Sequence, residues 1–309
     1  MENDNYLIVS IAKDKNIAKS IASNLDINYG DIFIKKTNIS ETSIEIDCYV
    51  ENKDIFLIYN ISQPINENII NLLFAVDELK KKGANKIFLF TNYLPYTKLK
   101  YESDRNINFN LFVRLLDEVK IDAIYTFDLY TPQIINAFKI PIYDISLKRI
   151  FYELFEEKFA KSTDLIITTI EYETEAKAKD LAKIINAQFL SSHKKINNNH
   201  EIAYELKEKI NGKDAIILTD VINSGNQVMA LAKYLTFKSI ENIYVISTNA
   251  QITEESSKLL EDSVIKEIYV ANCDNKFKSK KITIIPTYKI TQEIIQRVIE
   301  KKNVVNFIK

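Results

Sequence analysis

The sequence has few cysteines and no long apolar run. Its two cysteines, Cys48 and Cys273, lie far apart and share no motif spacing with each other or with the histidines, His193 and His200. This argues against a cysteine-based metal motif and favours unbridged thiols. No apolar stretch approaches the roughly 20 residues of a membrane-spanning helix, and no basic region precedes the short apolar run near the N-terminus. We therefore expect a cytoplasmic protein with no membrane partner.

Positive charge is also limited. The 41 lysines and arginines are balanced by 42 acidic residues, which leaves a formal net charge of -1. A nucleic-acid-binding protein usually carries a basic field, so we expect no nucleic acid partner. Only four of the basic residues are arginines: Arg105, Arg114, Arg149 and Arg297. Bidentate guanidinium contacts to phosphate must therefore be few.

Glycine is scarce as well, with four residues in 309. Two of them, Gly83 and Gly212, occur in the similar stretches "ELKKKGANKIFLF" and "ELKEKINGKDAIIL". Each stretch predicts a helix end, a glycine in the left-handed cap conformation and then an apolar strand. The repeated pattern indicates two similar α/β halves.

Alternating strand and helix patterns support this division, because such alternation is typical of a mainly parallel sheet with helices on both faces. The expected strands of the first half are 6–11, 44–50, 55–59, 87–91 and 123–127, with helices at 17–25, 67–82 and 109–119. The pattern restarts with strands at 165–169, 215–219, 243–248 and 265–270 and helices at 173–185, 226–235 and 254–260. We predict an α/β fold with domains at 1–147 and 148–309, in which the last helix or tail can pack back on the first domain.

The stretch "DAIILTDVINSGNQV", residues 214–228, holds the densest candidate site. An apolar strand runs into Thr219 and Asp220, and a Ser-Gly pair then opens a predicted helix. Open α/β sheets bind ligands at the carboxyl ends of their strands, and a helix N-terminus offers N–H donors to an anion. This pattern is typical of a sugar-phosphate site. A purely structural strand-to-helix turn is the alternative.

Longer stretches carry a family resemblance. The run "KDIFLIYNISQPINENIINLLFAVDELKKKGA" from Lys53 to Ala84, with "IDAIYTFDLYTPQIINAFKIPIYDI", "AKAKDLAKII" and the stretch at 214–228, resembles the ribose-phosphate pyrophosphokinases, or PRPP synthetases. The resemblance covers essentially the whole chain. It implies two phosphoribosyltransferase-like (type I) α/β domains, Mg²⁺ and ATP as cofactors, ribose 5-phosphate as substrate and a homodimer or larger homo-oligomer.

The family's ribose-phosphate motif has two acids for the ribose hydroxyls and an Asp-Thr-Gly-Gly-Thr turn around the 5-phosphate. The acids correspond here to Thr219 and Asp220. The residues that the resemblance assigns to ribose-phosphate binding are Asp220, Asn223, Ser224, Gly225, Asn226 and Gln227. Because one of the two ribose acids and one of the two turn glycines are lost, and the amide side chains of Asn226 and Gln227 now stand near the phosphate, we expect a weakened site for a sugar phosphate, phosphate or sulfate anion.

The nucleotide side departs further from the family. Its Phe-Ser-Asp-Gly-Glu contact to adenine corresponds to residues 37–41, where Glu41 alone is kept. Its Tyr-Phe-Gly-Tyr-Ala-Arg-Gln-Asp run corresponds to "YLPYTKLK", in which Tyr96 is kept, Lys98 replaces the arginine and Lys100 replaces the acid. The resemblance thus assigns nucleotide binding to Glu41, Tyr96 and Lys98.

The family's catalytic residues are also partly replaced. Its Asp-Leu-His motif becomes Asp128-Leu129-Tyr130, which makes Asp128 the metal candidate and puts a phenol in place of an imidazole. A flexible loop that supplies catalytic cations corresponds to 192–195, and the alignment leaves Lys194 and Lys195 as candidates. The pyrophosphate-binding Asp-x-Gly-Gly becomes 171–174, where large side chains, among them Glu173, are expected to fill the space for phosphates.

Each candidate has a structural alternative. An acid at a strand end is also an ordinary helix cap, which is as good an explanation for Asp220 and a better one for Asp128. The pair Lys194 and Lys195, like His193, is also typical of a solvated surface. Tyr96 is typical of a packed core or interface.

Three functions remain open. The first is a catalytically impaired ribose-phosphate pyrophosphokinase homologue that retains a ligand-binding or regulatory role, with no need for Mg²⁺ or ATP. The second is an active enzyme that makes PRPP from Mg-ATP and ribose 5-phosphate. The third is a phosphoribosyltransferase that uses only the second domain. The first is preferred because several separate site residues are replaced.

Overall fold

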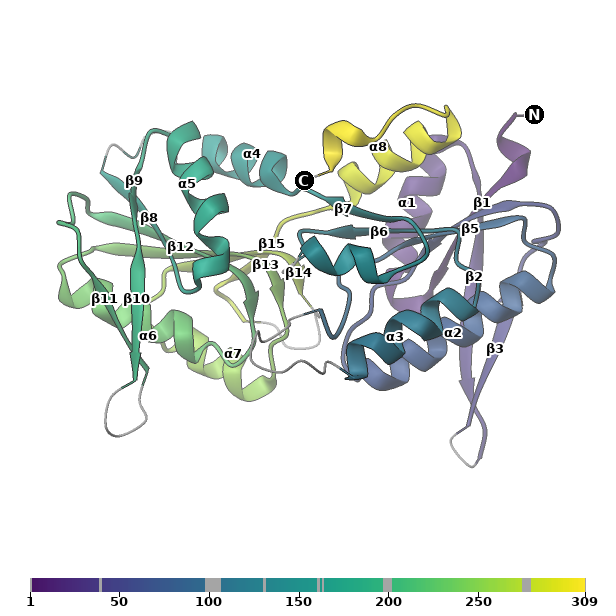
Figure 1. Ribbon diagram of the computed structural model, residues 1–309, viewed down its shortest axis with the longest axis horizontal. Helices are drawn as coiled ribbons and strands as arrows, with labels where there is room; N and C mark the ends of the chain where they lie inside the picture. Colours follow the sequence, from purple (N-terminus) through teal and green to yellow (C-terminus); the bar gives the residue numbers. More distant parts are fainter. Residues whose placement is uncertain are drawn as a thin grey trace. The chain divides into compact units, whose positions relative to one another are not determined.

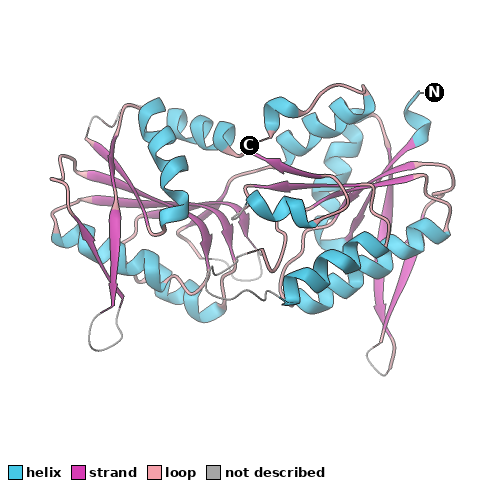
Figure 2. Ribbon diagram, viewed as in Figure 1, coloured by secondary structure: helices cyan, strands magenta, loops and turns pink. Residues whose placement is uncertain are grey.

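The described residues form two β-sheets of mainly parallel strands, each covered by helices, and a separate two-stranded hairpin (Figures 1 and 2). The computed structural model describes residues 2–38, 41–97, 107–129, 132–159, 162, 164–196, 202–273 and 279–308. The chain divides into two compact units, one formed by residues 1–146 with 288–309 and the other by residues 147–287. The expected α/β class with parallel sheets is confirmed.

The sheet of unit 1 has seven strands in the order β3-β2-β1-β4-β5-β6-β7, and all neighbours are parallel except β2 and β3. The strands are β1 (Tyr6–Ile11), β2 (Asn28–Lys36), β3 (Thr42–Asp47), β4 (Asp54–Ile58), β5 (Lys86–Phe90), β6 (Ala123–Phe127) and β7 (Ile142–Ile145). The central strands are buried along their length, as expected for a sheet with both faces covered.

Four helices cover this sheet: α1 (Lys15–Leu25), α2 (Ile65–Lys81), α3 (Ile107–Glu118) and α8 (Tyr288–Ile299). In Figure 1, α2 and α3 lie on one face and α1 and α8 on the other. Leu72 and Leu79 of α2 pack with Leu116 of α3 on a buried cluster from the sheet. Gly83 follows α2 with a φ of 86° and leads into β5, so its predicted role as a left-handed cap is confirmed.

The main sheet of unit 2 is fully parallel, in the order β15-β14-β13-β12-β8-β9. Its strands are β8 (Leu165–Thr169), β9 (Gln188–Leu190), β12 (Asp214–Ile222), β13 (Asn242–Ala250), β14 (Glu267–Cys273) and β15 (Ile282–Ile284). The helices are α4 (Lys148–Phe159), α5 (Glu175–Ile184), α6 (Asn226–Phe237) and α7 (Glu254–Glu261). Figure 1 shows α4 and α5 on one face and α6 and α7 on the other.

Two sequence predictions about unit 2 are wrong. The helix expected before Gly212 is absent from the described residues 202–213, where β11 (Ile202–Leu206) is followed by an irregular segment. Gly212 is required for close packing, since a Cβ there would lie 2.6 Å from the carbonyl oxygen of Asp164. The flexible loop expected at 192–195 is strand β10 (Ser192–Ile196), which pairs antiparallel with β11. The two strands form a hairpin separate from the main sheet.

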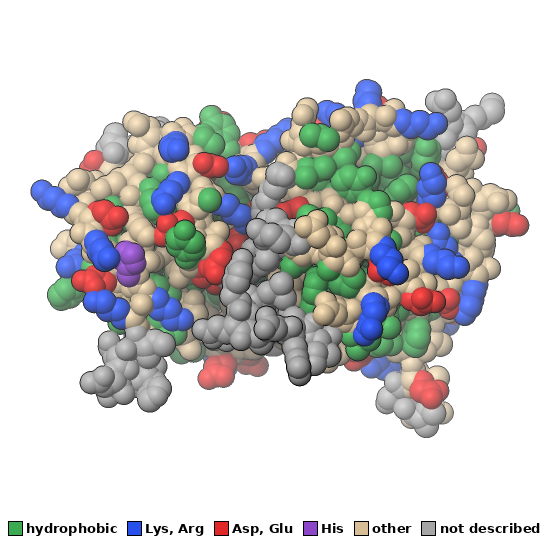
Figure 3. Space-filling view, viewed as in Figure 1, with side chains coloured by type: hydrophobic (Ala, Val, Ile, Leu, Met, Phe, Trp, Pro, Cys, Tyr) green, Lys and Arg blue, Asp and Glu red, His purple; other side chains and the backbone are tan. Residues whose placement is uncertain are grey.

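The surface of the described residues mixes both signs of charge. In the view of Figure 3, lysine and arginine side chains alternate with aspartate and glutamate over each unit, and no region of a single sign dominates. This agrees with the formal net charge of -1. Within the described residues, no helix is both long and apolar enough to cross a membrane.

Candidate ligand site at the carboxyl edge of unit 2

The carboxyl ends of β8, β12 and β13 form a buried polar edge in unit 2. Buried polar residues lie there, toward the carboxyl ends of strands that begin with apolar stretches; they include Thr169, Thr219, Asp220, Ser247 and Asn249. The parallel register places Leu218 beside Thr169 and Thr219 beside Ser247, so these residues come from neighbouring strands at one level of the sheet. Ligands bind at this edge in open α/β sheets.

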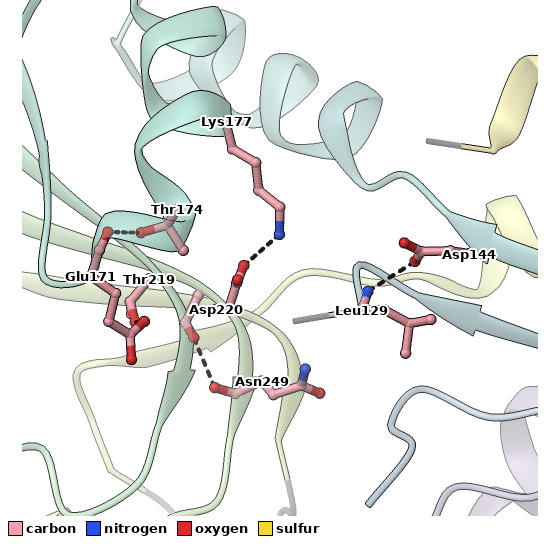
Figure 4. A network of polar contacts seen from close by, with 9 residues as sticks. Leu129, Asp144, Glu171, Thr174, Lys177, Thr219, Asp220 and Asn249 are labelled. Carbon is pink, nitrogen blue, oxygen red and sulfur yellow. Dashed lines mark hydrogen bonds and ion pairs between the residues drawn. The ribbon is translucent and has the colours of Figure 1, made fainter. Parts of the chain in front are cut away.

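Asp220 forms a buried ion pair (Figure 4). Its carboxylate accepts a hydrogen bond from the ammonium group of Lys177, with 2.5 Å between Nζ and Oδ1. The side chains are only 5% and 19% exposed for Asp220 and Lys177 respectively. Asp220 lies within β12, and the helix that follows has Gly225 at its N-cap. The alternative that Asp220 caps this helix is therefore wrong.

The loop after β8 is held by hydrogen bonds to one residue, Glu171. Thr169 and Thr174 donate their hydroxyl groups to the Glu171 carbonyl oxygen, at 3.1 and 2.9 Å, and close a short 3-10 turn, η4 (Tyr172–Thr174). The Thr219 hydroxyl donates to the Glu171 carboxylate at 3.3 Å (Figure 4). The neighbouring Glu173 is exposed, and its expected place in the space for phosphates stays a prediction, whereas Glu171 is the acid that contacts Thr219.

The turn between β12 and α6 depends on Gly225. This residue has a φ of 76°, a left-handed conformation that L side chains rarely adopt, and a Cβ there would lie 2.9 Å from Cδ2 of Leu260. Asn223, Ser224 and Asn226 are exposed, and no side chain caps the helix N-terminus. The Ser224 hydroxyl accepts only a long 3.4 Å hydrogen bond from the Asn226 N–H. The predicted strand-turn-helix is thus present, with Gln227 half-buried in its first turn.

Two further strands contribute residues that sequence reasoning missed. Ser247 donates its hydroxyl hydrogen to the Asn249 carbonyl oxygen at 2.7 Å, and the Asn272 amide donates to the Asn249 side-chain oxygen at 2.9 Å. The first of these contacts is drawn in Figure 4. The sequence carried a signal for these residues, because each of the two apolar strands ends in a stretch that contains asparagine. In the sheet, Asn249 lies beside Asn272.

The hairpin is joined to the same edge. Ser192 donates to the carbonyl oxygen of Thr169, and Tyr204 donates to that of Ile170 at 3.4 Å. Lys194 lies opposite Tyr204 in the register, so the two side chains share a face with Ser192. Burial, together with the nearby charge of Glu171, raises the pKa of Tyr204 to about 12.

The two lysine candidates therefore differ. Lys195 lies on the opposite face of the hairpin and forms an exposed ion pair with Glu205. Lys194 is exposed and lies on the same face of the hairpin as Ser192, which contacts the end of β8. His193 is exposed, on a strand and not in the loop expected for it.

Unit 1 has a corresponding polar edge. Asp128 follows β6, is buried and has a φ of 43°. The backbone N–H of Leu129 donates to the carboxylate of Asp144 at 2.8 Å (Figure 4). The metal-binding and capping roles of Asp128 both stay predictions, and Tyr130 lies outside the described residues.

The nucleotide candidates of unit 1 lie in separate places. Glu41 is exposed at the turn between β2 and β3, where its backbone N–H bonds to the Thr37 hydroxyl. The Tyr96 ring packs edge-on against Phe112, with 5.9 Å between centroids, as the packing alternative expects. Lys98 lies outside the described residues. Nucleotide binding by these three residues stays a prediction.

A second network on unit 1 escaped the sequence analysis. Tyr29 donates to Asp31 at 2.6 Å and lies 2.9 Å from the Ser10 hydroxyl, while Lys15 donates to the other Asp31 oxygen at 2.7 Å. Burial and the hydrogen bond to Asp31 raise the pKa of Tyr29. Burial acts to raise the pKa of Asp31 as well, but the hydrogen bonds from Lys15 and Tyr29 outweigh it and hold that pKa below its ordinary value.

Family models identify both parts of the chain. Residues 6–119 match the N-terminal domain of ribose phosphate pyrophosphokinase, and residues 175–309 match the phosphoribosyl synthetase-associated domain. The ribose-phosphate pyrophosphokinase of Bacillus cereus is 26% identical over 98% of this chain and 96% of its own length. The chain belongs to the ribose-phosphate pyrophosphokinase family.

Other members of the family agree with this assignment. The ribose-phosphate pyrophosphokinase of Bacillus subtilis is 27% identical over 90% of this chain and 88% of its own length. The crystal structure of phosphoribosylpyrophosphate synthetase from Mycobacterium smegmatis superposes with a TM-score of 0.86 at 18% identity, covering 96% of this chain and 100% of that one. The suspected family and its fold are thus confirmed.

The family resemblance implies Mg²⁺, which places specific demands on the residues that would bind it. Mg²⁺ is held by oxygen ligands, mainly carboxylates and water, in near-octahedral geometry. Among the described residues, no group of three or more His, Cys, Asp or Glu side chains could hold a metal ion. In unit 2, the Asp220 carboxylate is bonded to Lys177 and the Glu171 carboxylate to Thr219. These side chains do not form a protein-built site for a divalent cation.

Proposed function

We propose that this chain is a ribose-phosphate pyrophosphokinase homologue with strongly reduced PRPP synthesis, and that unit 2 retains a site for a sugar phosphate. Its role is ligand binding or regulation in nucleotide metabolism. The observation that carries the proposal is the turn at Ser224 and Gly225, which leads into a twelve-residue helix with no side-chain cap. Its exposed N-terminus offers N–H donors and a favourable dipole to a phosphate group.

Reduced catalysis is supported by replacements at several separate positions. Thr219 is neutral where the family motif has an acid, and its hydroxyl is bonded to Glu171. Tyr130 replaces the imidazole of the family motif, and Lys100 reverses a charge. Losses at separate parts of a catalytic site multiply in rate, so the combined loss should be large.

A second candidate is the active enzyme, favoured by the position of Lys194. The family resemblance assigns a catalytic lysine to this segment, and Lys194 shares a hairpin face with Ser192, which contacts the end of β8. One positioned cation can stabilise phosphoryl transfer only together with metal and nucleotide contacts. ATP and Mg²⁺ therefore belong to this second candidate.

An assay with ATP, Mg²⁺ and ribose 5-phosphate, coupled to AMP detection, separates the two candidates. We expect a rate far below the roughly 1–100 s⁻¹ typical of kinases. A thermal-shift titration with ribose 5-phosphate, phosphate and sulfate tests the retained site. A ligand at 100 times its Kd should add about 2.7 kcal/mol of stability. If no anion stabilises the protein, the turn is only structural.

We further propose that the chain forms a homodimer or a larger homo-oligomer, as the family resemblance implies. Static light scattering at micromolar concentration tests this. A mass near the 35.8 kDa of one chain would refute it.

A further inference from the structure

The position of Lys177 is unfavourable unless a nearby acid compensates for it. It is the third residue of α5, where the positive end of the helix dipole disfavours a cation. Its side chain is also mostly buried, which disfavours the charged form. The carboxylate of Asp220, 2.5 Å away on the neighbouring β12, supplies the compensating charge.

Other oxygen atoms at the carboxyl edge of unit 2 already accept hydrogen bonds. The Glu171 carbonyl accepts from Thr169 and Thr174, and the Asn249 side-chain oxygen accepts from Asn272. A divalent cation that bound Asp220 would have to displace Lys177 and leave its ammonium group buried without this carboxylate. The cost of breaking this buried ion pair opposes that exchange.

We propose that the ammonium group of Lys177 takes the place at Asp220 that a divalent cation would occupy, so that Asp220 is not a metal ligand in this protein. It follows, where the proposed sugar-phosphate site exists, that unit 2 binds the sugar phosphate without a metal. Lys177 fixes the direction of the Asp220 carboxylate at the carboxyl edge, where the resemblance places the ribose hydroxyls.

A manganese titration tests the first statement without any sugar phosphate. Mn²⁺ substitutes for Mg²⁺ and free Mn²⁺ is measured directly by electron paramagnetic resonance. The Asp220→Asn variant, with Lys177 in place, should bind Mn²⁺ as the wild type does. Lys177→Met should gain Asp220-dependent Mn²⁺ binding that the wild type lacks, and adding Asp220→Asn should abolish this gain.

The matched control is Lys179→Met, two positions along the same helix, where the lysine forms an exposed ion pair with Glu175. It should leave Mn²⁺ binding unchanged. The proposal is overturned if Asp220→Asn weakens Mn²⁺ binding in the wild type, or if Lys177→Met gains no site although its circular dichroism spectrum is native. If Lys177→Met does not fold, the wild-type comparison with Asp220→Asn decides alone.

A second titration tests metal-free ligand binding. The Kd of ribose 5-phosphate, obtained from its thermal shifts, should agree within a factor of two between excess EDTA and Mg²⁺. A shift that requires Mg²⁺ overturns metal-free binding. The absence of a shift under both conditions refutes the proposed sugar-phosphate site, while the manganese result still decides the role of Lys177.

Discussion

Replacing Gly225 by alanine should destabilise unit 2 for two separable reasons. A left-handed backbone costs an L residue roughly 1–2 kcal/mol, partly offset by about 0.4–1 kcal/mol because alanine restricts the unfolded chain. The new Cβ would also lie 2.9 Å from Cδ2 and 3.1 Å from Cγ of Leu260, which is fully buried. Overpacking of a core typically costs about 1–3 kcal/mol. We therefore expect a total loss of about 2–4 kcal/mol.

Gly83 provides the control for the backbone contribution. Its φ of 86° is similar, but a Cβ there would meet no atom closer than 3.2 Å, and that atom belongs to the exposed side chain of Glu51. Gly83→Ala should therefore cost only about 1 kcal/mol. The chain has no tryptophan, so urea unfolding followed by circular dichroism is the assay.

A double-mutant cycle isolates the packing contribution. Leu260→Ala removes both atoms that approach the new Cβ, so it should cost about 1–2 kcal/mol less in the Gly225→Ala background than in the wild type. Equal losses for the two glycine variants, or a cycle with no coupling, would refute the role of Leu260. Phosphate-induced stabilisation should also fall in Gly225→Ala and remain in Gly83→Ala.

Three further predictions concern charge and catalysis. Because the pKa of Asp31 is lowered, its stabilising contribution is complete above the ordinary value near 3.8 and is lost as the pH falls through the lower folded-state value. The free energies of unfolding of wild type and Asp31→Asn should therefore converge in acid. A difference in urea midpoint that stays constant between pH 7 and pH 2 would contradict this. Tyr130→His should recover little PRPP synthesis in the coupled assay, since the other replacements remain; recovery to within tenfold of about 1 s⁻¹ would show that one residue accounts for the loss. Lys194→Met should weaken stabilisation by ribose 5-phosphate or ATP in thermal-shift titrations while Lys195→Met leaves it unchanged, and equal effects would argue against the facing inferred from the hairpin register.

Local patterns made most of the fold predictable. The stretch at 214–228 combines four apolar residues, a polar strand end and a Ser-Gly pair, and each of these signals acts within a few residues. The strand, the turn and helix α6 therefore appear where expected. The hairpin was missed because β10 contains a polar run, "SHKKI", without the apolar alternation that marks a half-buried strand.

The helix expected before Gly212 shows how a local pattern misleads. Glycine after a lysine-rich segment is typical of a helix end, but it also permits a close approach of two backbones. The contact with Asp164 selects the second role, and it depends on a residue that is distant in the sequence. The glycine alone does not distinguish the two roles.

Partners of the site residues were harder to predict than the residues themselves. Asp220 was identified from its place near a strand end, whereas its ion-pair partner is 43 positions away on helix α5. Glu171 belongs to a segment whose large side chains are expected from the sequence to fill the space for phosphates. Its hydrogen bond to Thr219 depends on the turn after β8. Such pairs follow from strand order, which the sequence pattern did not specify.

The hairpin formed by β10 and β11 is a separate two-stranded sheet that meets the main sheet through side chains at its base. Its strands share no backbone ladder with the six-stranded sheet among the described residues, so their amide hydrogens can open to solvent while that sheet stays closed. In hydrogen exchange, β10 should lose protection well before β12, and both strands of the hairpin should lose it together. Any ligand that contacts Lys194 would then slow hydrogen exchange in a segment that can open while the six-stranded sheet keeps its own backbone ladder.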